Sequence, residues 1–222
     1  MNSPLLEVVE VSTARDPQVS IIWMHGLGAD GHDFEPIVPQ LAAAVGRPLR
    51  FIFPHAPVRP VTLNGGMPMR AWYDMLGLDR NSAQDERGIA ASANRVTALI
   101  RRENERGVSA GHIVLAGFSQ GGALALYLGV RYPQRLAGIV ALSSYLPMAD
   151  KLTAEASAAN RATPIFMAHG SFDGVIDESV GLDSRVLLQT QGYAVEWRTY
   201  PMDHAVCEQE IADIAAFLQR VL

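Results

Sequence analysis

The sequence has 222 residues and a formal net charge of −5, and 49% of its residues are hydrophobic against 18% charged. This balance is typical of a globular chain that buries a substantial core. The negative charge and the lack of a lysine- or arginine-rich run argue against a nucleic-acid partner.

The chain has one cysteine, Cys207, which rules out an intrachain disulfide and is typical of a reducing compartment. Residues 1–10 lack the basic region and the long apolar core of a signal peptide. No apolar run reaches the roughly 18 residues that a membrane span needs. We therefore expect a cytoplasmic protein without a membrane span, folded as a single domain over residues 1–222.

Short apolar runs alternate with segments of helical periodicity along the whole chain. Strands are predicted at residues 5–11, 19–24, 50–53, 112–116, 136–142, 164–168 and 194–200. Helices are predicted at residues 34–45, 85–106, 122–130, 178–190 and 206–222. This alternation predicts an α/β fold with a mostly parallel central sheet and helices on both faces.

Residues 55–80 form the longest stretch without a strand or helix pattern. Long loops inside compact domains are usually functional or disordered, and this one is too apolar to be disordered. We expect a wall or flap over a substrate groove, to which Leu63 and Met67 contribute adaptable apolar surface. A satellite core beneath a loop is the alternative for the same side chains.

The run Gly117-Phe118-Ser119-Gln120-Gly121 matches the pattern G-x-S-x-G between a predicted strand and a predicted helix. In this context the pattern predicts a nucleophile elbow, a tight turn that holds the serine in a strained conformation with its hydroxyl exposed. Glycines are required because a Cβ at either end would collide with the neighbouring backbone. A glycine-rich corner with an incidental serine is the alternative.

A serine hydroxyl becomes a nucleophile only when a base removes its proton, and the base needs an acceptor that fixes its tautomer. Ser119, Asp173 and His204 occur in the chain order of α/β-hydrolases, and each follows a predicted strand, so they can meet at one edge of the sheet. Asp177 is the rival acid, but its position suits the start of a helix. His169 precedes Asp173 and suits a hydrogen-bonded structural role.

Negative charge that develops on an attacked carbonyl needs preorganised donors, and losing one costs about 3–4 kcal/mol of transition-state stabilisation. The backbone N–H of Gln120 at the helix N-terminus is one expected donor. The second is expected from the glycine-rich loop after the second strand, at the N–H of Leu27. Cys207 is expected to be a small buried filler, and the histidines show no clustering that supports a metal site.

At this point the sequence closely resembles the small carboxylesterases and acyl-protein thioesterases of the α/β-hydrolase fold. The resemblance is carried by motifs along nearly the whole chain, at residues 25–31, 70–74, 117–122, 142–147, 169–176 and 200–204. It implies Ser119, Asp173 and His204 as the triad and the Leu27 and Gln120 amides as the oxyanion hole. It also implies an α/β-hydrolase without a large cap domain and with a shallow acyl groove.

By the same resemblance, Trp72 is expected to support the substrate groove. The activity expected first is that of a serine carboxylesterase, acting through an acyl-enzyme intermediate on small-molecule or lipid acyl esters without a cofactor. The alternatives are an acyl-protein thioesterase or lysophospholipase with the same site, with acylated proteins as partners, and a non-catalytic binding module that keeps the hydrolase fold. An apolar groove rim would also allow a weak homodimer.

Overall fold

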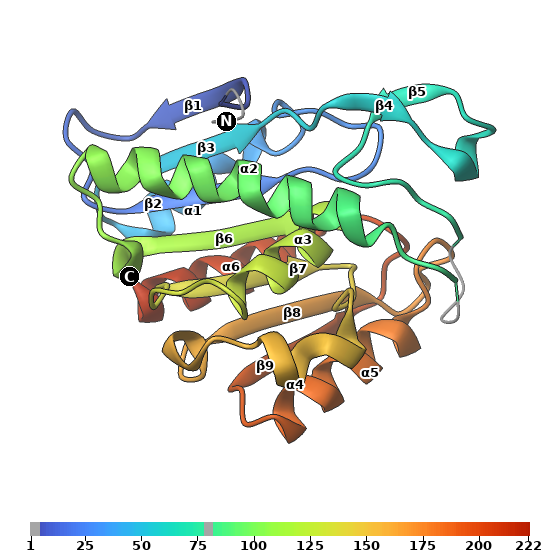
Figure 1. The fold of residues 1–222 in the computed structure, drawn as a ribbon. Helices are drawn as coiled ribbons and strands as arrows, with labels where there is room; N and C mark the ends of the chain where they lie inside the picture. The colour runs from blue at the N-terminus through green and yellow to red at the C-terminus, as the bar shows by residue number, and fades with distance from the viewer. Residues whose placement is uncertain (1–4, 78–81) are drawn as a thin grey trace.

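The computed structural model describes residues 5–77 and 82–222. A seven-stranded sheet with the strand order β1-β3-β2-β6-β7-β8-β9 runs through the centre of the molecule (Figure 1). The strands are β1 (Val8–Ser12), β2 (Ser20–Met24), β3 (Arg50–Pro54), β6 (Ile113–Phe118), β7 (Gly138–Leu142), β8 (Ile165–Gly170) and β9 (Val195–Tyr200). Only the β1–β3 pair is antiparallel among these pairings, so the predicted mostly parallel sheet is confirmed.

Helices cover both faces of this sheet (Figure 1). They are α1 (Val38–Val45), α2 (Glu86–Glu105), α3 (Gln120–Gly129), α4 (Leu152–Glu155), α5 (Glu178–Thr190) and α6 (Glu208–Val221). α1 and α6 share one apolar core with one face of the sheet, and α2, α3 and α5 share a second core with the other face. The strands β2, β3, β7 and β8 are buried at every position because both faces are covered.

The predicted helix over residues 34–45 begins differently in the structure. A 3₁₀ turn at Glu35–Ile37 precedes α1, which starts at Val38. Pro39 therefore lies in the first turn of the α-helix, where a missing backbone N–H leaves no intrahelical bond unmade.

The prediction that residues 55–80 lack regular structure is wrong for the described part of that segment. It contains a two-stranded antiparallel sheet of β4 (Val58–Pro60) and β5 (Pro68–Arg70), with a 3₁₀ turn at Thr62–Asn64 between them. Gly65 and Gly66 follow this turn with φ of 65° and 79°, a conformation that glycine adopts without strain. Residues 78–81 of the predicted segment lie outside the described residues.

The loops after the parallel strands all reach the right-hand edge of the molecule in Figure 1. Within residues 5–77 and 82–222, no separate cap domain covers this edge. Of the helices that the structure describes, none combines the length and the apolar character needed to cross a membrane.

Candidate active site

Ser119 stands at the corner between β6 and α3, in the strained conformation that the motif predicts. Its φ and ψ are 53° and −121°, although it is not a glycine. A Cβ on Gly117 would lie 2.3 Å from the carbonyl carbon of Gly121, and a Cβ on Gly121 would lie 2.2 Å from the carbonyl oxygen of Met24. The corner is therefore sterically closed to any residue larger than glycine on either side of the serine.

A chain of hydrogen bonds joins Ser119 to the two other residues of the predicted triad. The hydroxyl of Ser119 lies 3.0 Å from Nε2 of His204, and Nδ1 of His204 lies 2.7 Å from Oδ2 of Asp173. The carboxylate can only accept, so Nδ1 carries the proton and Nε2 is left to accept from the serine. This is the tautomer that a general base requires.

Backbone bonds between two loops hold the acid and the histidine together. The N–H of Ser171 donates to the carbonyl of Tyr200 at 2.8 Å, and the N–H of Phe172 donates to the carbonyl of Met202 at 3.0 Å. The loop after β8, which carries Asp173, is therefore fastened to the loop after β9, which carries His204. The relative position of the two side chains is fixed by main-chain geometry.

The carboxylate of Asp173 is fully buried and has a partner for each oxygen. Oδ1 accepts from the N–H groups of Val175 and Ile176, each at 2.9 Å. Oδ2 faces His204 and also lies 3.3 Å from Nε2 of His169, whose ring is buried behind it. Nε2 of His169 donates to the carbonyl of Ile176 at 2.8 Å, which confirms the expected hydrogen-bonded role for that ring.

Two other expectations near the triad have opposite outcomes. Asp177 is the N-cap of α5 and accepts from the N–H of Ser179 at 2.9 Å, as its position predicts. Cys207 was expected to be a buried filler and is only partly buried: it is the N-cap residue of α6 and packs against the core beside that helix. The helix starts later than predicted, which leaves this residue at the surface end of the turn.

A mostly apolar cavity of about 270 Å³, which we call the catalytic cavity, opens in front of Ser119 and His204. Leu27 and Gln120 both line it, so the two expected oxyanion-hole residues lie beside the nucleophile. A Cβ placed on Gly26 would lie 3.5 Å from Cβ of Ser119, which shows how closely the 25–28 loop passes the elbow.

The three expected groove residues occupy different places. Leu63 lines the catalytic cavity and is 48% exposed. Met67 is 60% exposed and is absent from the cavity lining, so its placement in the groove is not supported. Trp72 is fully buried and does not line the cavity. Its indole N–H donates to the carbonyl of His25 at 2.9 Å, in the loop that carries Leu27.

Two buried side chains that the sequence analysis did not assign hold the oxyanion loop and the elbow in place. The ring of His25 accepts from the N–H of Ala56 at 3.0 Å, and burial lowers its pKa to about 4, so it is neutral at pH 7. The amide of Gln120 accepts from the N–H of Trp72 at 2.7 Å and donates to the carbonyl of Tyr73 at 2.9 Å. The Gln120 side chain therefore has a structural role beside the role predicted for its backbone N–H.

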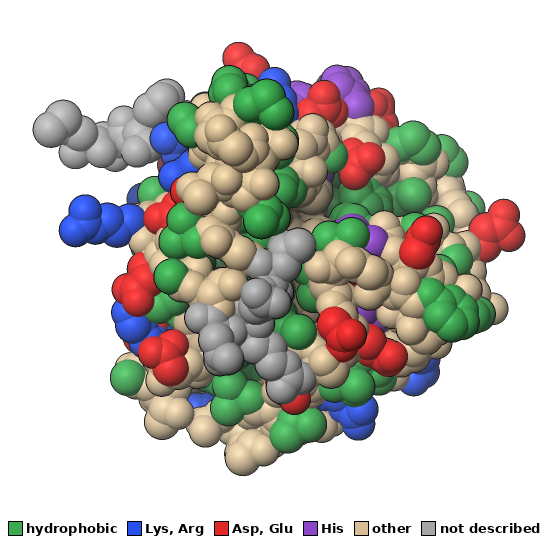
Figure 2. All heavy atoms as spheres, turned by 90° about the vertical axis from the view of Figure 1, so that its right-hand side faces the viewer, with side chains coloured by type: hydrophobic (Ala, Val, Ile, Leu, Met, Phe, Trp, Pro, Cys, Tyr) green, Lys and Arg blue, Asp and Glu red, His purple; other side chains and the backbone are tan. Residues whose placement is uncertain are grey.

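Figure 2 shows the face of the molecule onto which these loops open. Hydrophobic side chains gather around a hollow in which histidine is visible, and acidic side chains are scattered over the surrounding surface. Among the described residues, no group of three or more His, Cys, Asp or Glu side chains is placed to hold a metal ion. The surface at this edge is suited to a largely apolar, uncharged ligand.

A family model described as phospholipase/carboxylesterase matches residues 6–222. The chain belongs to this family. Acyl-protein thioesterase 1 of Neurospora crassa is 41% identical over 208 residues, covering 90% of this chain and 85% of that protein. Acyl-protein thioesterase 1 of Mycosarcoma maydis is 35% identical over 233 residues, covering 97% of this chain and 96% of that protein.

Solved structures of similar proteins have the same fold. SOBER1 of Arabidopsis thaliana aligns with a TM-score of 0.86 at 30% identity, covering 91% of this chain and 98% of that chain. Acyl-protein thioesterase 2 of Zea mays aligns with a TM-score of 0.84 at 30% identity, covering 97% and 98%. The chain is therefore a serine hydrolase with the α/β-hydrolase fold, as the resemblance implied.

Proposed function

We propose that this member of the family hydrolyses acyl thioesters and the corresponding esters, with Ser119 as nucleophile, His204 as base and Asp173 as its orienting acid. The proposal rests above all on the unbroken chain of hydrogen bonds, 3.0 Å and 2.7 Å long, that ends in an apolar cavity. Ser119 attacks the acyl carbonyl carbon while its proton passes to Nε2 of His204. The backbone N–H groups of Leu27 and Gln120 stabilise the oxyanion.

The imidazolium of His204 then returns its proton to the leaving group, and the acyl chain remains on Ser119 as an ester. Water enters as the leaving group departs, His204 removes a proton from it, and a second tetrahedral intermediate collapses to the free acid and the serine hydroxyl. Neither half-reaction needs a cofactor, because nucleophile, base and oxyanion donors are all supplied by the chain.

The sequence favours a carboxylester as substrate over a thioester, and the names of the relatives favour the reverse order. The chemistry of the site accommodates both. A thiol has a pKa near 8.5 and leaves a tetrahedral intermediate more readily than an alcohol, so a triad that cleaves esters also cleaves thioesters. Acylated proteins are accordingly the partner class we propose, with lysophospholipids and simple esters as further substrates.

We also propose a cytoplasmic location and a weak homodimer. The single cysteine supports a reducing cytoplasmic location. The exposed apolar side chains Leu63, Met67 and Phe172 support a weak homodimer through the face that carries the site.

Labelling with a serine-directed phosphonate tests the nucleophile. We expect one adduct at Ser119, its loss in Ser119→Ala, and unchanged labelling in Ser109→Ala, which alters an exposed serine before β6. A wild-type protein that folds but forms no adduct contradicts the catalytic role and favours a non-catalytic binding module.

A panel of matched thioesters and esters, each from acetyl to palmitoyl, tests the substrate class. The proposal predicts higher kcat/KM for each thioester than for the ester with the same acyl group. A consistent preference for esters would restore the order that the sequence suggested, and exclusive turnover of lysophospholipids would contradict both.

A further inference from the structure

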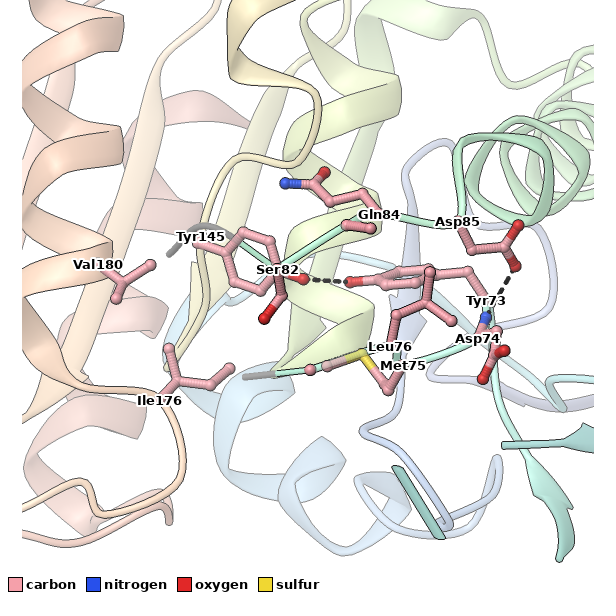
Figure 3. A pocket seen from close by; sticks show the side chains of 12 residues that line it. Tyr73, Asp74, Met75, Leu76, Ser82, Gln84, Asp85, Tyr145, Ile176 and Val180 are labelled. Atoms are coloured by element: carbon pink, nitrogen blue, oxygen red, sulfur yellow. Dashed lines mark hydrogen bonds between the residues drawn. The ribbon is translucent and has the colours of Figure 1, made fainter. Parts of the chain in front are cut away.

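A second, narrower cavity adjoins the catalytic cavity. This outer pocket has a volume of about 60 Å³ and shares four lining residues with the catalytic cavity: Tyr73, Met75, Tyr145 and Ile176. Figure 3 looks into it from close by, with Ile176 and Val180 on one side and Met75 and Leu76 on the other. These four apolar side chains extend one wall of the catalytic cavity into the outer pocket, whose remaining lining is largely polar and includes Asp74, Ser82, Gln84 and Asp85.

Tyr73 and Tyr145 line both cavities, and Figure 3 shows their hydroxyls facing each other. The two oxygens are 3.3 Å apart, longer than the 2.5–3.0 Å usual for a hydroxyl–hydroxyl bond, so the link is weak. Burial raises the pKa of Tyr73 and of Tyr145 above the ordinary value, so both hydroxyls stay protonated around neutral pH and the link does not depend on titration there.

The two tyrosines differ in how firmly they are held. Tyr73 is 2% exposed, packs in the core, and its backbone carbonyl accepts from the Gln120 amide at 2.9 Å. Tyr145 is only partly buried and lies in the loop after β7, where the next residue, Leu146, donates its N–H to the hydroxyl of Ser184 at 2.9 Å. The backbone beside Tyr145 is thus anchored while its side chain is the freer of the two.

We propose that Tyr73 and Tyr145 form a gate that sets the length of acyl chain the enzyme accepts. Short chains occupy the catalytic cavity with the gate closed. Longer chains enter the outer pocket only when the Tyr145 side chain turns away from Tyr73. This inference rests on the proposed function, because it takes the catalytic cavity to hold the acyl group attached to Ser119.

The gate predicts a particular shape for the dependence of kcat/KM on chain length. Each methylene that is buried adds roughly fourfold to kcat/KM, from about 0.8 kcal/mol of transfer free energy. In the wild type this increase should be interrupted once, at the length that reaches the tyrosines. Chains beyond that length gain buried surface but lose the hydroxyl link, which lowers their kcat/KM by about 2- to 10-fold.

The test measures kcat/KM for thioesters of one thiol from acetyl to palmitoyl, with enzyme concentrations taken from phosphonate titration of Ser119. Tyr145→Phe should raise the ratio of long-chain to short-chain kcat/KM by about 2- to 10-fold, because it removes the link and keeps the ring. Tyr145→Ala should move the break in the profile to longer chains. Tyr193→Phe, which alters another buried tyrosine outside both cavities, should leave the profile as it is.

The gate is overturned if the break stays at the same chain length in Tyr145→Ala while phosphonate still labels Ser119 fully. The proposed function would stand in that case. A wild-type enzyme that forms no adduct and turns over no chain length overturns the proposed function and the gate with it. Equal losses at all lengths in Tyr145→Phe would show a merely structural role and also refute the gate.

Discussion

Replacing Asp173 by Asn separates the orienting acid from its rival and can be worked out from the hydrogen bonds of the site. An asparagine has one acceptor oxygen and one donor NH₂ where the carboxylate has two acceptors. Two backbone N–H groups, from Val175 and Ile176, point at Oδ1 from 2.9 Å. Turning the NH₂ toward them would leave both unpaired at about 1–3 kcal/mol each, so the amide oxygen takes that side.

The NH₂ of the asparagine then faces Nδ1 of His204. That nitrogen must now accept, which moves the imidazole proton to Nε2, the atom that lies 3.0 Å from the hydroxyl of Ser119. A protonated Nε2 cannot take the serine proton, so kcat should fall by roughly 10⁴-fold, or about 5.5 kcal/mol. The assay is kcat for a short thioester, with circular dichroism to show that the fold is retained.

Asp177→Asn is the matched control for this substitution. Asp177 caps α5 through the N–H of Ser179, and asparagine is about as good an N-cap as aspartate. Its kcat should stay within about twofold of the wild type. If Asp177→Asn inactivates the enzyme while Asp173→Asn leaves it active, the assignment of the acid is wrong and so is the tautomer reasoning.

Three further substitutions test other buried positions of the fold. Gln120→Ala leaves two buried backbone groups unpaired and should lower the free energy of unfolding by about 2–4 kcal/mol in urea, whereas Gln134→Ala, at an exposed position, should not change it. Gly121→Ala places a Cβ 2.2 Å from a backbone oxygen and should abolish phosphonate labelling, while Gly111→Ala, whose nearest neighbour is 4.0 Å away, should label normally. Burial raises the pKa of Glu210 to about 8, so between pH 6.5 and pH 8 the folded state holds a proton that the unfolded state has lost. The free energy of unfolding should therefore fall by about 1.5 kcal/mol from pH 6.5 to pH 8. Glu210→Gln should remove this loss.

The members of the candidate triad could be chosen from the sequence because each follows a strand of a parallel sheet. Ser119, Asp173 and His204 come after β6, β8 and β9, and parallel strands carry their C-terminal loops to one edge. The choice used the period of the apolar runs, the glycines of the elbow and the chain order of serine, acid and histidine in α/β-hydrolases. It did not need any side-chain contact to be foreseen.

The small β4–β5 sheet could not be predicted in the same way. Its strands are three residues long and each contains a proline, which in a sequence argues against a strand. The Gly65-Gly66 pair is a turn signal, but a turn between two such short runs does not stand out from a loop. Pairing across the turn is a tertiary fact that the local pattern does not carry.

The roles of His25 and Gln120 were missed for a related reason. The sequence motifs assign no role to His25 and predict a role only for the backbone N–H of Gln120. Their side chains bind backbone groups of residues 56, 72 and 73, which are 31 to 48 positions away in the chain. No periodicity or motif predicts contacts of this range between a side chain and a loop backbone.

These two side chains also bear on how the proposed gate can open. His25 lies in the loop after β2, and Gln120 is the first residue of α3, directly after the elbow that follows β6. β2 and β6 are neighbouring strands, and both side chains are bonded to the 56–73 segment. Displacing Tyr73 would pull on Gln120 and so on the amide expected to bind the oxyanion. Turning the Tyr145 side chain disturbs neither His25 nor Gln120, because none of the hydrogen bonds described above joins Tyr145 to them.

A gate that opens through Tyr145 should therefore leave the chemical step unaffected by acyl length. We expect kcat for acylation, measured by single-turnover kinetics, to stay within about threefold from short to long chains, with the chain-length dependence carried by binding. A loss of one oxyanion donor would instead lower kcat by about 10²–10³-fold. A fall of that size confined to long chains would mean that they displace Tyr73, and that the oxyanion loop and the acyl pocket are mechanically coupled.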